Sequence, residues 1–134
     1  MTRADLWALV FGRAGGRCEY CRMPDGVGVA LELDHVRPKK HRGSDDESNM
    51  ALACPRCNVV KGANAAGYDP LTDELTRLFD PRTDDWAGHF AFEGSVVVGR
   101  TAVGRTTVDV LRMNSDGRVA RRQALTAVGH DFGP

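Results

Sequence analysis

Four cysteines in two Cys-x-x-Cys pairs are the residues whose types and spacing most directly indicate chemistry. One pair lies in "CEYC" and the other in "CPRC", and together they are all the cysteines of the 134-residue chain: Cys18, Cys21, Cys54 and Cys57. Each pair can present two thiolates to the same side of one ion, so two pairs complete a closed, tetrahedral Cys₄ site of the structural zinc type. The sequence therefore predicts structural zinc, with a redox role for one pair as the alternative.

Residues suited to hydrolysis follow the first cysteine pair. Asp34 and His35 are adjacent, Asn49 precedes the second pair, and Asn58 directly follows Cys57. Hydrolysis of a phosphodiester needs a base to activate water, and histidine, with an unperturbed pKa of about 6.5, suits that task. A divalent ion can stabilise the charge that develops on the phosphate and the leaving oxygen. Taken singly, each residue also has an ordinary structural explanation, such as a loop cap for Asn49.

A basic stretch lies next to the Asp-His pair. Between Val36 and Ser44 the sequence has no acidic residue but four basic ones: Arg37, Lys39, Lys40 and Arg42. Lys61 lies one helical turn after Asn58. Such side chains contact phosphates and position a nucleic acid without reading its sequence. A solvated loop is the other explanation of the basic stretch.

The elements that would position these residues can be read from periodicity and turn signals. Apolar residues at helical spacing predict a helix over 4–13, and alternation predicts a strand over 27–36 that ends at Pro38. A polar loop over 41–49 and a short strand over 49–54 follow. Pro55 suits the first turn of a helix that we expect to continue through residue 66. The expected order is strand, loop, strand and helix.

The combined pattern resembles the HNH endonucleases, a family of ββα-metal (His-Me finger) nucleases. The matching segments are "LELDHVRP", "GSDDESNMALAC" and "CNVVKG", and the resemblance covers roughly residues 14–64, including two zinc knuckles that many members carry. It implies an α+β fold with a ββα-metal core clipped by the Cys₄ zinc site. The family's last histidine is here Asn58, an HNN-type variant. An amide oxygen is a harder ligand than imidazole and favours Mg²⁺ or Mn²⁺.

The resemblance also implies roles for individual residues. His35 would be the general base, Asp34 and Asn58 would hold one catalytic divalent ion (Mg²⁺ or Mn²⁺), and Asn49 would orient the His35 loop and ring. The implied activity is metal-dependent hydrolysis of DNA, with RNA left open as a substrate. The residues expected to contact the nucleic acid are Arg37, Lys39, Lys40, Arg42 and Lys61. The alternatives are a non-catalytic zinc module that binds nucleic acid and a zinc-clipped protein-interaction domain.

Residues 67–134 differ in character from the nuclease-like segment in residues 1–66. Two short strands are expected within 89–105, with a turn at Glu93-Gly94, and helices are expected over 106–113 and 114–129. A similar tail follows the nuclease core in many short bacterial HNH proteins. We expect this C-terminal β-hairpin with its helices to pack on the core. The alternatives are a protein-contact surface or a DNA-clamping arm that uses Arg118, Arg121 and Arg122.

Composition excludes some classes of protein but names no partner. The 18 basic and 18 acidic residues cancel, so the overall charge does not indicate a nucleic acid. No apolar run approaches the ~20 residues needed to cross a membrane, and the N-terminal segment lacks the pattern of a secretory signal. We therefore expect a cytoplasmic protein, where cysteines serve as metal ligands more often than as disulfides. The oligomeric state is left open.

Overall fold

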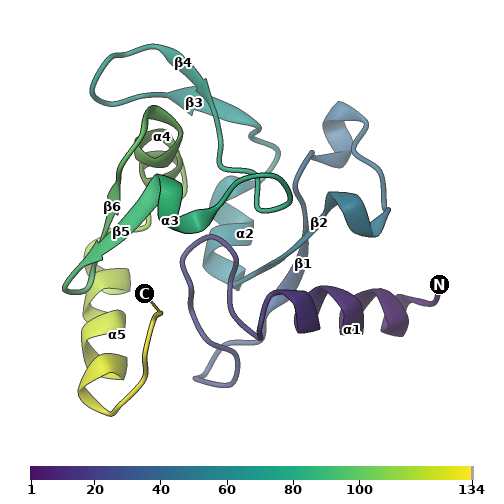
Figure 1. Ribbon diagram of the computed structural model, residues 1–134, viewed down its shortest axis with the longest axis horizontal. Coiled ribbons are helices and arrows are strands. Elements are labelled where there is room, and N and C mark those ends of the chain that lie inside the picture. Colours follow the sequence, from purple (N-terminus) through teal and green to yellow (C-terminus); the bar gives the residue numbers. More distant parts are fainter. Residues whose placement is uncertain (134) are drawn as a thin grey trace. The chain divides into compact units, whose positions relative to one another are not determined.

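The computed structural model describes residues 1–133, which form two compact units. The first unit comprises residues 1–65 and 80–83, and the second comprises residues 66–79 and those from 84 onward. Helices and short antiparallel strands occur in both units (Figure 1), so the expected α+β class is confirmed. The packing of residues 67–134 on the core stays a prediction.

The first unit has the expected order of strand, loop, strand and helix. It contains helix α1 (Arg3–Arg13), strand β1 (Glu32–His35), strand β2 (Met50–Ala53) and helix α2 (Pro55–Lys61). Two 3₁₀ turns, η1 (Lys39–His41) and η2 (Glu47–Asn49), lie in the loop between the strands. The strands pair antiparallel with His35 opposite Met50, and all four residues of β2 are buried. This hairpin therefore forms the centre of the unit.

Strand β1 is much shorter than the alternation over residues 27–36 suggested. Its partner β2 offers only four residues before Cys54 enters the second cysteine pair, so only four residues of β1 can be paired. Gly28 in this segment and Gly26 just before it have φ values of +87° and +82°, which an extended strand does not contain. Alternation predicted the strand correctly, but pairing set its length.

Helix α2 also ends before the predicted residue 66. It begins with Cys54 as the N-cap and Pro55 in the first turn, as expected, and ends at Lys61. Gly62 follows with φ +51° and ψ −129°, a combination that disfavours residues with a Cβ atom and stops the helix. The helix therefore has only two turns, which is enough to carry both Asn58 and Lys61.

Residues 80–83 belong to the first unit, and Arg82 among them forms an ion pair within it. The guanidinium of Arg82 contacts the carboxylate of Glu19, and both side chains are largely buried. The other oxygen of Glu19 accepts a hydrogen bond from the backbone N–H of Leu52, at 2.8 Å. Glu19 thus links the first cysteine pair to strand β2.

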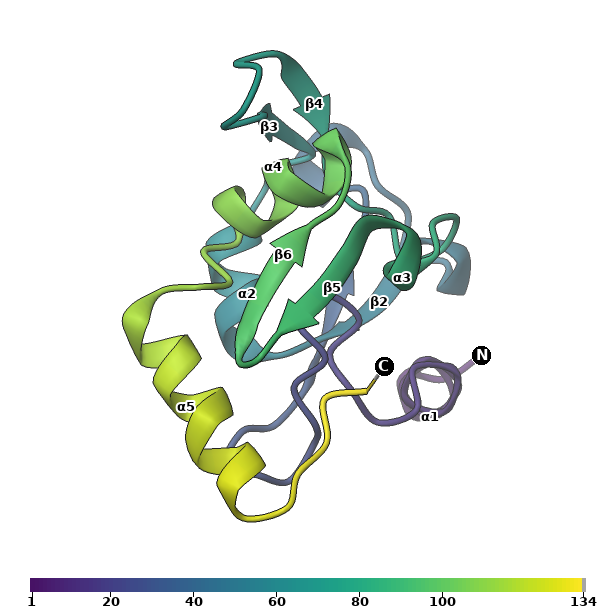
Figure 2. The ribbon, with the colours of Figure 1, turned by 60° about the vertical axis from the view of Figure 1, so that its left-hand side comes forward.

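The second unit contains two hairpins and three helices. Its elements are β3 (Ala66–Tyr68), β4 (Leu75–Arg77), α3 (Trp86–His89), β5 (Phe90–Glu93), β6 (Val96–Gly99), α4 (Ala102–Val110) and α5 (Asp116–Ala127). Hairpin β5–β6 confirms the two strands predicted there, and α4 follows β6 directly (Figure 2). Helix α4 begins four residues earlier than predicted because Thr101 caps it, accepting from the N–H of Gly104 at 3.0 Å. Hairpin β3–β4 was not anticipated.

Two arginines of α5 point into the second unit and not toward solvent. Arg118 and Arg122 are only 7% and 1% exposed. Arg118 donates to the carbonyl oxygen of Leu111 at 2.6 Å, and Arg122 donates to those of Ser95 and Met113 at 2.7 Å. These contacts argue against a DNA-clamping role for this pair, because both side chains are engaged within the second unit. Arg121 is exposed.

Asp69 organises the loop of hairpin β3–β4. Its buried carboxylate accepts two hydrogen bonds from Arg105 of α4, at 3.0 and 2.8 Å, and one from the N–H of Leu71. The Arg105 guanidinium is the main reason that the pKa of Asp69 falls from 3.8 to about 2. A lowered pKa means that the pair stabilises the folded unit above pH 3.8 and that this stabilisation is lost as pH falls toward 2.

We expect Arg105→Gln to flatten the pH dependence of stability in the acid range. The wild-type second unit should lose stability between pH 3.8 and about 2, whereas the variant should lose less, because its Asp69 pKa lies closer to the ordinary value. Denaturant unfolding can be followed through Trp86, which lies in this unit, in a Trp7→Phe background. If the unfolding free energy depended on pH equally in the two proteins, the Asp69–Arg105 pair would not be the cause of the acid sensitivity.

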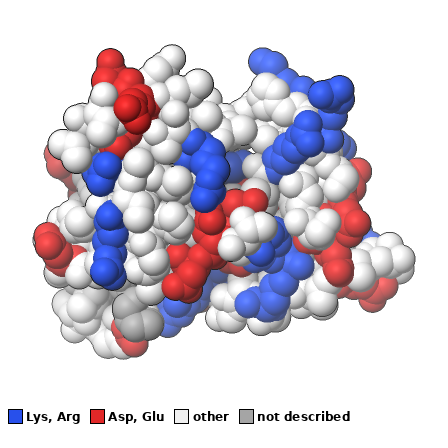
Figure 3. Space-filling model, turned by 45° about the horizontal axis from the view of Figure 1, so that its top comes forward, with Lys and Arg blue, Asp and Glu red and all other residues white. Residues whose placement is uncertain are grey.

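The face of the molecule drawn in Figure 3 is not dominated by charged side chains of one sign. Lys and Arg side chains alternate there with Asp and Glu, as the balanced composition suggests. Among the described residues, no helix combines the length and apolar character that a membrane crossing requires.

Candidate active site and four-cysteine cluster

His35 lies at the end of β1, in a hollow of about 600 Å³. Its imidazole is 26% exposed, and Nε2 lies 2.8 Å from Oδ1 of Asp45 in the loop between the strands. Lys39 contacts the same carboxylate oxygen at 3.3 Å. A partly exposed imidazole with one nitrogen engaged is suited to proton transfer, because the other nitrogen can face the hollow.

Asp45 is a site residue that the sequence analysis did not single out. The hydrogen bond from His35 is the main reason that the pKa of Asp45 falls below its ordinary value, and Lys39 adds to the effect. An ionised carboxylate only accepts hydrogen bonds, so Nε2 of His35 is the donor in this contact, and in the neutral imidazole the lone pair is on Nδ1. No sequence signal connects two residues ten positions apart in a polar loop; only the loop conformation brings them together.

We expect Asp45→Ala to have a modest effect on any reaction that uses the His35 imidazole. The pair is exposed, so its loss should lower the rate by only a few-fold. Asp45→Glu, which keeps the carboxylate, should restore part of the loss. An unchanged rate in Asp45→Ala would show that the contact has no functional role.

Asn49 ties down the loop that carries the basic stretch. Its Nδ2 donates to the carbonyl oxygens of Arg37 and Ser44, at 3.0 and 2.8 Å, and its Oδ1 accepts from the N–H of Arg37 at 2.8 Å. Gly43 makes this closure possible, since a Cβ there would lie 1.7 Å from the carbonyl oxygen of Arg37. These bonds go to the loop backbone and not to the His35 ring.

Asp34 faces the opposite way from His35, as neighbouring residues of a strand do. It is 4% exposed, accepts from the hydroxyl of Tyr20 at 2.7 Å and lies 3.2 Å from the ammonium of Lys61. Burial raises the pKa of Asp34, and Lys61 and Tyr20 offset part of that rise. In this arrangement a cation already compensates the buried carboxylate.

Lys61 does not occupy a position from which it could contact a phosphate. It is only 1% exposed, and its Nζ donates to Oδ1 of Asp34 and to the backbone carbonyl of His35, the latter at 2.8 Å. This corrects its expected nucleic-acid contact. The expectation rested on its place one turn after Asn58, but that face of α2 packs on β1 and the side chain points inward.

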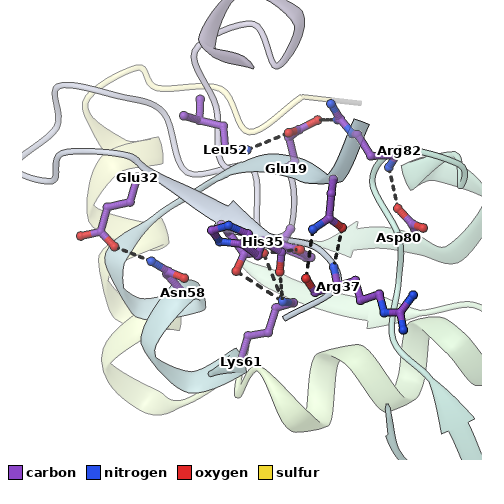
Figure 4. Close-up of polar contacts among 12 residues, drawn as sticks. Glu19, Glu32, His35, Arg37, Leu52, Asn58, Lys61, Asp80 and Arg82 are labelled. Atoms are coloured by element: carbon purple, nitrogen blue, oxygen red, sulfur yellow. Dashed lines mark hydrogen bonds and ion pairs between the residues drawn. The ribbon is translucent and has the colours of Figure 1, made fainter. Parts of the chain in front are cut away.

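Asn58 contacts Glu32 and not Asp34. Its Nδ2 donates to Oε1 of Glu32 at 2.7 Å (Figure 4). Both residues line a second hollow of about 760 Å³. Glu32 precedes Asp34 by two residues, so strand alternation directs both carboxylates toward α2. That alternation was visible in the sequence and could have drawn attention to Glu32. The structure does not bring Asp34 and Asn58 into contact.

The basic stretch is exposed in the loop that follows β1. Arg37, Lys39, Lys40 and Arg42 are all exposed, and Arg37 also donates from Nε to the carbonyl oxygen of His41 at 2.7 Å. Their side chains are therefore accessible to a phosphate backbone.

The four cysteines form one buried cluster, as the spacing predicted. Their sulfur atoms all lie within 4.8 Å of one another, and those of Cys21 and Cys54 are 3.6 Å apart. Tetrahedral coordination with Zn–S bonds of about 2.3 Å places two sulfurs at about 3.8 Å. In each pair the backbone N–H of the second cysteine donates to the sulfur of the first, at 3.4 Å, which orients both sulfurs inward. The cluster is compatible with zinc.

The cluster is built into the elements that carry the candidate active site. Helix α2 starts at Cys54 and carries Asn58 and Lys61, while Tyr20, between the first two cysteines, hydrogen-bonds Asp34. Displacement of either cysteine pair would therefore move the partners of β1.

Comparison with known proteins agrees with this architecture. Residues 18–64 match the family model of the HNH endonuclease, and this segment holds the cysteine cluster and the candidate active site. The resemblance seen in the sequence is thus confirmed for this segment.

A relative was also found. Over 115 residues, 84% of this chain, the protein is 27% identical to the Septu protein PtuB of Bacillus thuringiensis. The aligned segment covers 42% of that relative, so this chain spans less than half of its length. No solved structure gives a significant match.

Proposed function

We propose that the protein is a metal-dependent endonuclease that hydrolyses DNA phosphodiester bonds, with His35 as the general base. The observation that carries the proposal is the orientation of His35 within a segment that matches the HNH endonucleases. Because Asp45 accepts from Nε2, Nδ1 can take a proton from a water molecule in the hollow. The backbone of His35 is held by Lys61 and its loop by Asn49, so the ring is positioned before substrate binds.

The divalent ion, Mg²⁺ or Mn²⁺, would stabilise negative charge on the scissile phosphate and the leaving oxygen. Asp34 and Asn58 remain its proposed ligands, and Glu32 joins them as an oxygen donor that already contacts Asn58. Carboxylate and amide oxygens suit a hard cation. Lys61 contacts Asp34 in this structure, so Asp34 would bind the ion only in exchange for that ammonium, and a divalent ion would bring two positive charges where Lys61 supplies one.

The remaining roles follow from charge and burial. We propose that the exposed stretch Arg37, Lys39, Lys40 and Arg42 contacts the phosphate backbone. The cysteine cluster is closed and buried, so we propose that it holds structural zinc and takes no part in the reaction.

Conversion of supercoiled plasmid to open circles tests the proposal. The purified zinc-loaded protein should convert the plasmid in the presence of Mg²⁺ or Mn²⁺ and should not convert it in EDTA. Exposure to EDTA is kept short enough that the zinc content of the protein does not change. Short oligonucleotides of DNA and RNA, single-stranded and duplex, extend the test to RNA and to unpaired strands, which a plasmid does not offer. A folded, zinc-loaded protein that cuts none of them with either ion would overturn the proposal and favour a non-catalytic binding module.

A further inference from the structure

Helix α1 forms one wall of a groove that contains His35. The hollow around His35 and the hollow around Asn58 share Arg3 of α1 and Leu33 of β1, so they meet at these two residues. Volumes of about 600 and 760 Å³ fall within the range of about 300–1,000 Å³ that is common for ligand sites. Helix α1 lies outside residues 18–64, the segment that matches the nuclease family.

The face that α1 turns to the groove combines a cation with an aromatic ring. Arg3, Leu6 and Trp7 line the hollows, and their spacing of three and four residues places them on one side of the helix. The indole of Trp7 packs against the ring of Phe11, with centroids 5.7 Å apart. Trp7 is half-buried, and this neighbour restricts the indole, so that little side-chain entropy would be lost on binding.

The helix is held firmly enough to serve as a platform. A capping box fixes its start, because Asp5 N–H donates to Thr2 Oγ1 at 3.0 Å and Thr2 N–H donates to Asp5 Oδ2 at 2.9 Å. Near its end, Arg13 donates to the carbonyl oxygens of Glu47 and Met50, both at 2.6 Å. The helix is therefore anchored to η2 and β2, the elements beside His35.

Charge in the groove distinguishes its two sides. On the loop side, Asp45, Asp46 and Glu47 line the hollow together with Lys39, which contacts Asp45 at 3.3 Å. Three carboxylates and one ammonium leave this side negative, which disfavours a phosphate next to the carboxylates. On the α1 side the lining cation is Arg3, next to Trp7. A polynucleotide in this groove would thus place a phosphate near Arg3 and a base against the indole.

We propose that the α1 face formed by Arg3 and Trp7 is a binding site for an unpaired nucleotide next to the scissile phosphate, the base stacking on Trp7 and a phosphate contacting Arg3. The inference rests on the proposed nuclease function and specifies its substrate. Bases inside a continuous duplex already stack on both faces, so only a single-stranded or locally unpaired nucleotide can stack on an indole. Single-stranded nucleic acid is therefore bound more tightly than continuous duplex.

Binding of a short fluorescein-labelled oligothymidine to the full chain in a His35→Ala background tests this site. Trp7→Leu should weaken binding roughly 5- to 150-fold, the equivalent of about 1–3 kcal/mol for one stacked base. Trp7→Phe should recover most of the loss. Leu9→Ala is the matched control, since Leu9 is 39% exposed on the same helix and lines neither hollow. Arg3→Gln should reduce the magnitude of the slope of log K against log[salt] for single-strand binding by about 0.7, which is the contribution of one phosphate contact.

A second measurement does not depend on the stability of Trp7→Leu. Unlabelled oligothymidine should quench tryptophan fluorescence in the His35→Ala protein, and Trp7→Phe, which leaves only Trp86, should remove the quenching. Three results would overturn the nucleotide site. The first is equal quenching in the two proteins, and the second is equal affinity of Trp7→Leu and its parent for oligothymidine. The third is tighter binding of duplex than of single strand. These results leave the proposed function untouched, because that depends on ion-dependent cleavage by the protein with His35 intact.

Discussion

His35→Ala should lower the rate of nucleic-acid cleavage by about 10²- to 10⁴-fold while leaving the fold and the cysteine cluster intact. The side chain lies at the end of β1, is partly exposed and contributes no hydrogen bond to the core, since its Nε2 contacts the exposed Asp45. The structural role at this position belongs to the backbone carbonyl, which accepts from Lys61 and is unaffected by the substitution. Loss of the imidazole thus removes the base without removing support for the strand.

His41→Ala provides the matched control for this prediction. His41 is exposed on η1, close to His35 in sequence, but lines neither hollow. The measurement is single-turnover cleavage with Mg²⁺ or Mn²⁺ in excess, alongside circular dichroism and zinc content for each protein. The mechanism would be wrong if His35→Ala cleaved at the wild-type rate, or if His41→Ala lost as much activity as His35→Ala.

Cys57→Ser should unfold the first unit. Cys57 is fully buried, and its backbone N–H donates to the sulfur of Cys54, so the substitution alters a cluster and the first turn of α2 together. A structural zinc contributes its binding free energy to folding, with apparent values of about 10–16 kcal/mol for zinc-finger peptides near neutral pH. A first unit of this size buries too small a core to fold without that contribution. Loss of the cluster would release the partners of Asp34 and His35 as well.

Val59→Ser is the control for the cysteine substitution, because it introduces the same residue into the same helix at a position that is 75% exposed. Zinc content and thermal unfolding should be near wild type in Val59→Ser, whereas Cys57→Ser should lack both bound zinc and the unfolding transition of the first unit. Trp7 and Trp86 lie in different units, so Trp→Phe variants report on each unit separately. A Cys57→Ser protein that retained one zinc and a wild-type transition would show that the cluster is not the support of this fold.

Local sequence signals were sufficient for most of the elements. Paired cysteines, alternating apolar residues and Pro55 are short-range features, and they located the cluster, both strands of the first hairpin and the start of α2 correctly. The lengths of β1 and α2 were wrong, because pairing with β2 and the backbone at Gly62 end these elements. Hairpin β3–β4 was missed, and Asp69 in its loop is held by Arg105, a partner 36 residues away that no local signal indicates.

The sequence by itself determined that four cysteines would meet, that Asp34 and His35 would end a strand, and that the chain would resemble the HNH nucleases. Only the tertiary structure decided which way each polar side chain points. It turned Lys61 and Arg122 inward, joined Asn58 to Glu32, and brought Asp45 to His35. The physical reason is that residue types and spacing define which local structures are favourable, whereas the direction of a charged side chain depends on the partners that neutralise it. Those partners lie outside the local pattern, ten residues away for Asp45 and 26 for Glu32, and only folding places them side by side.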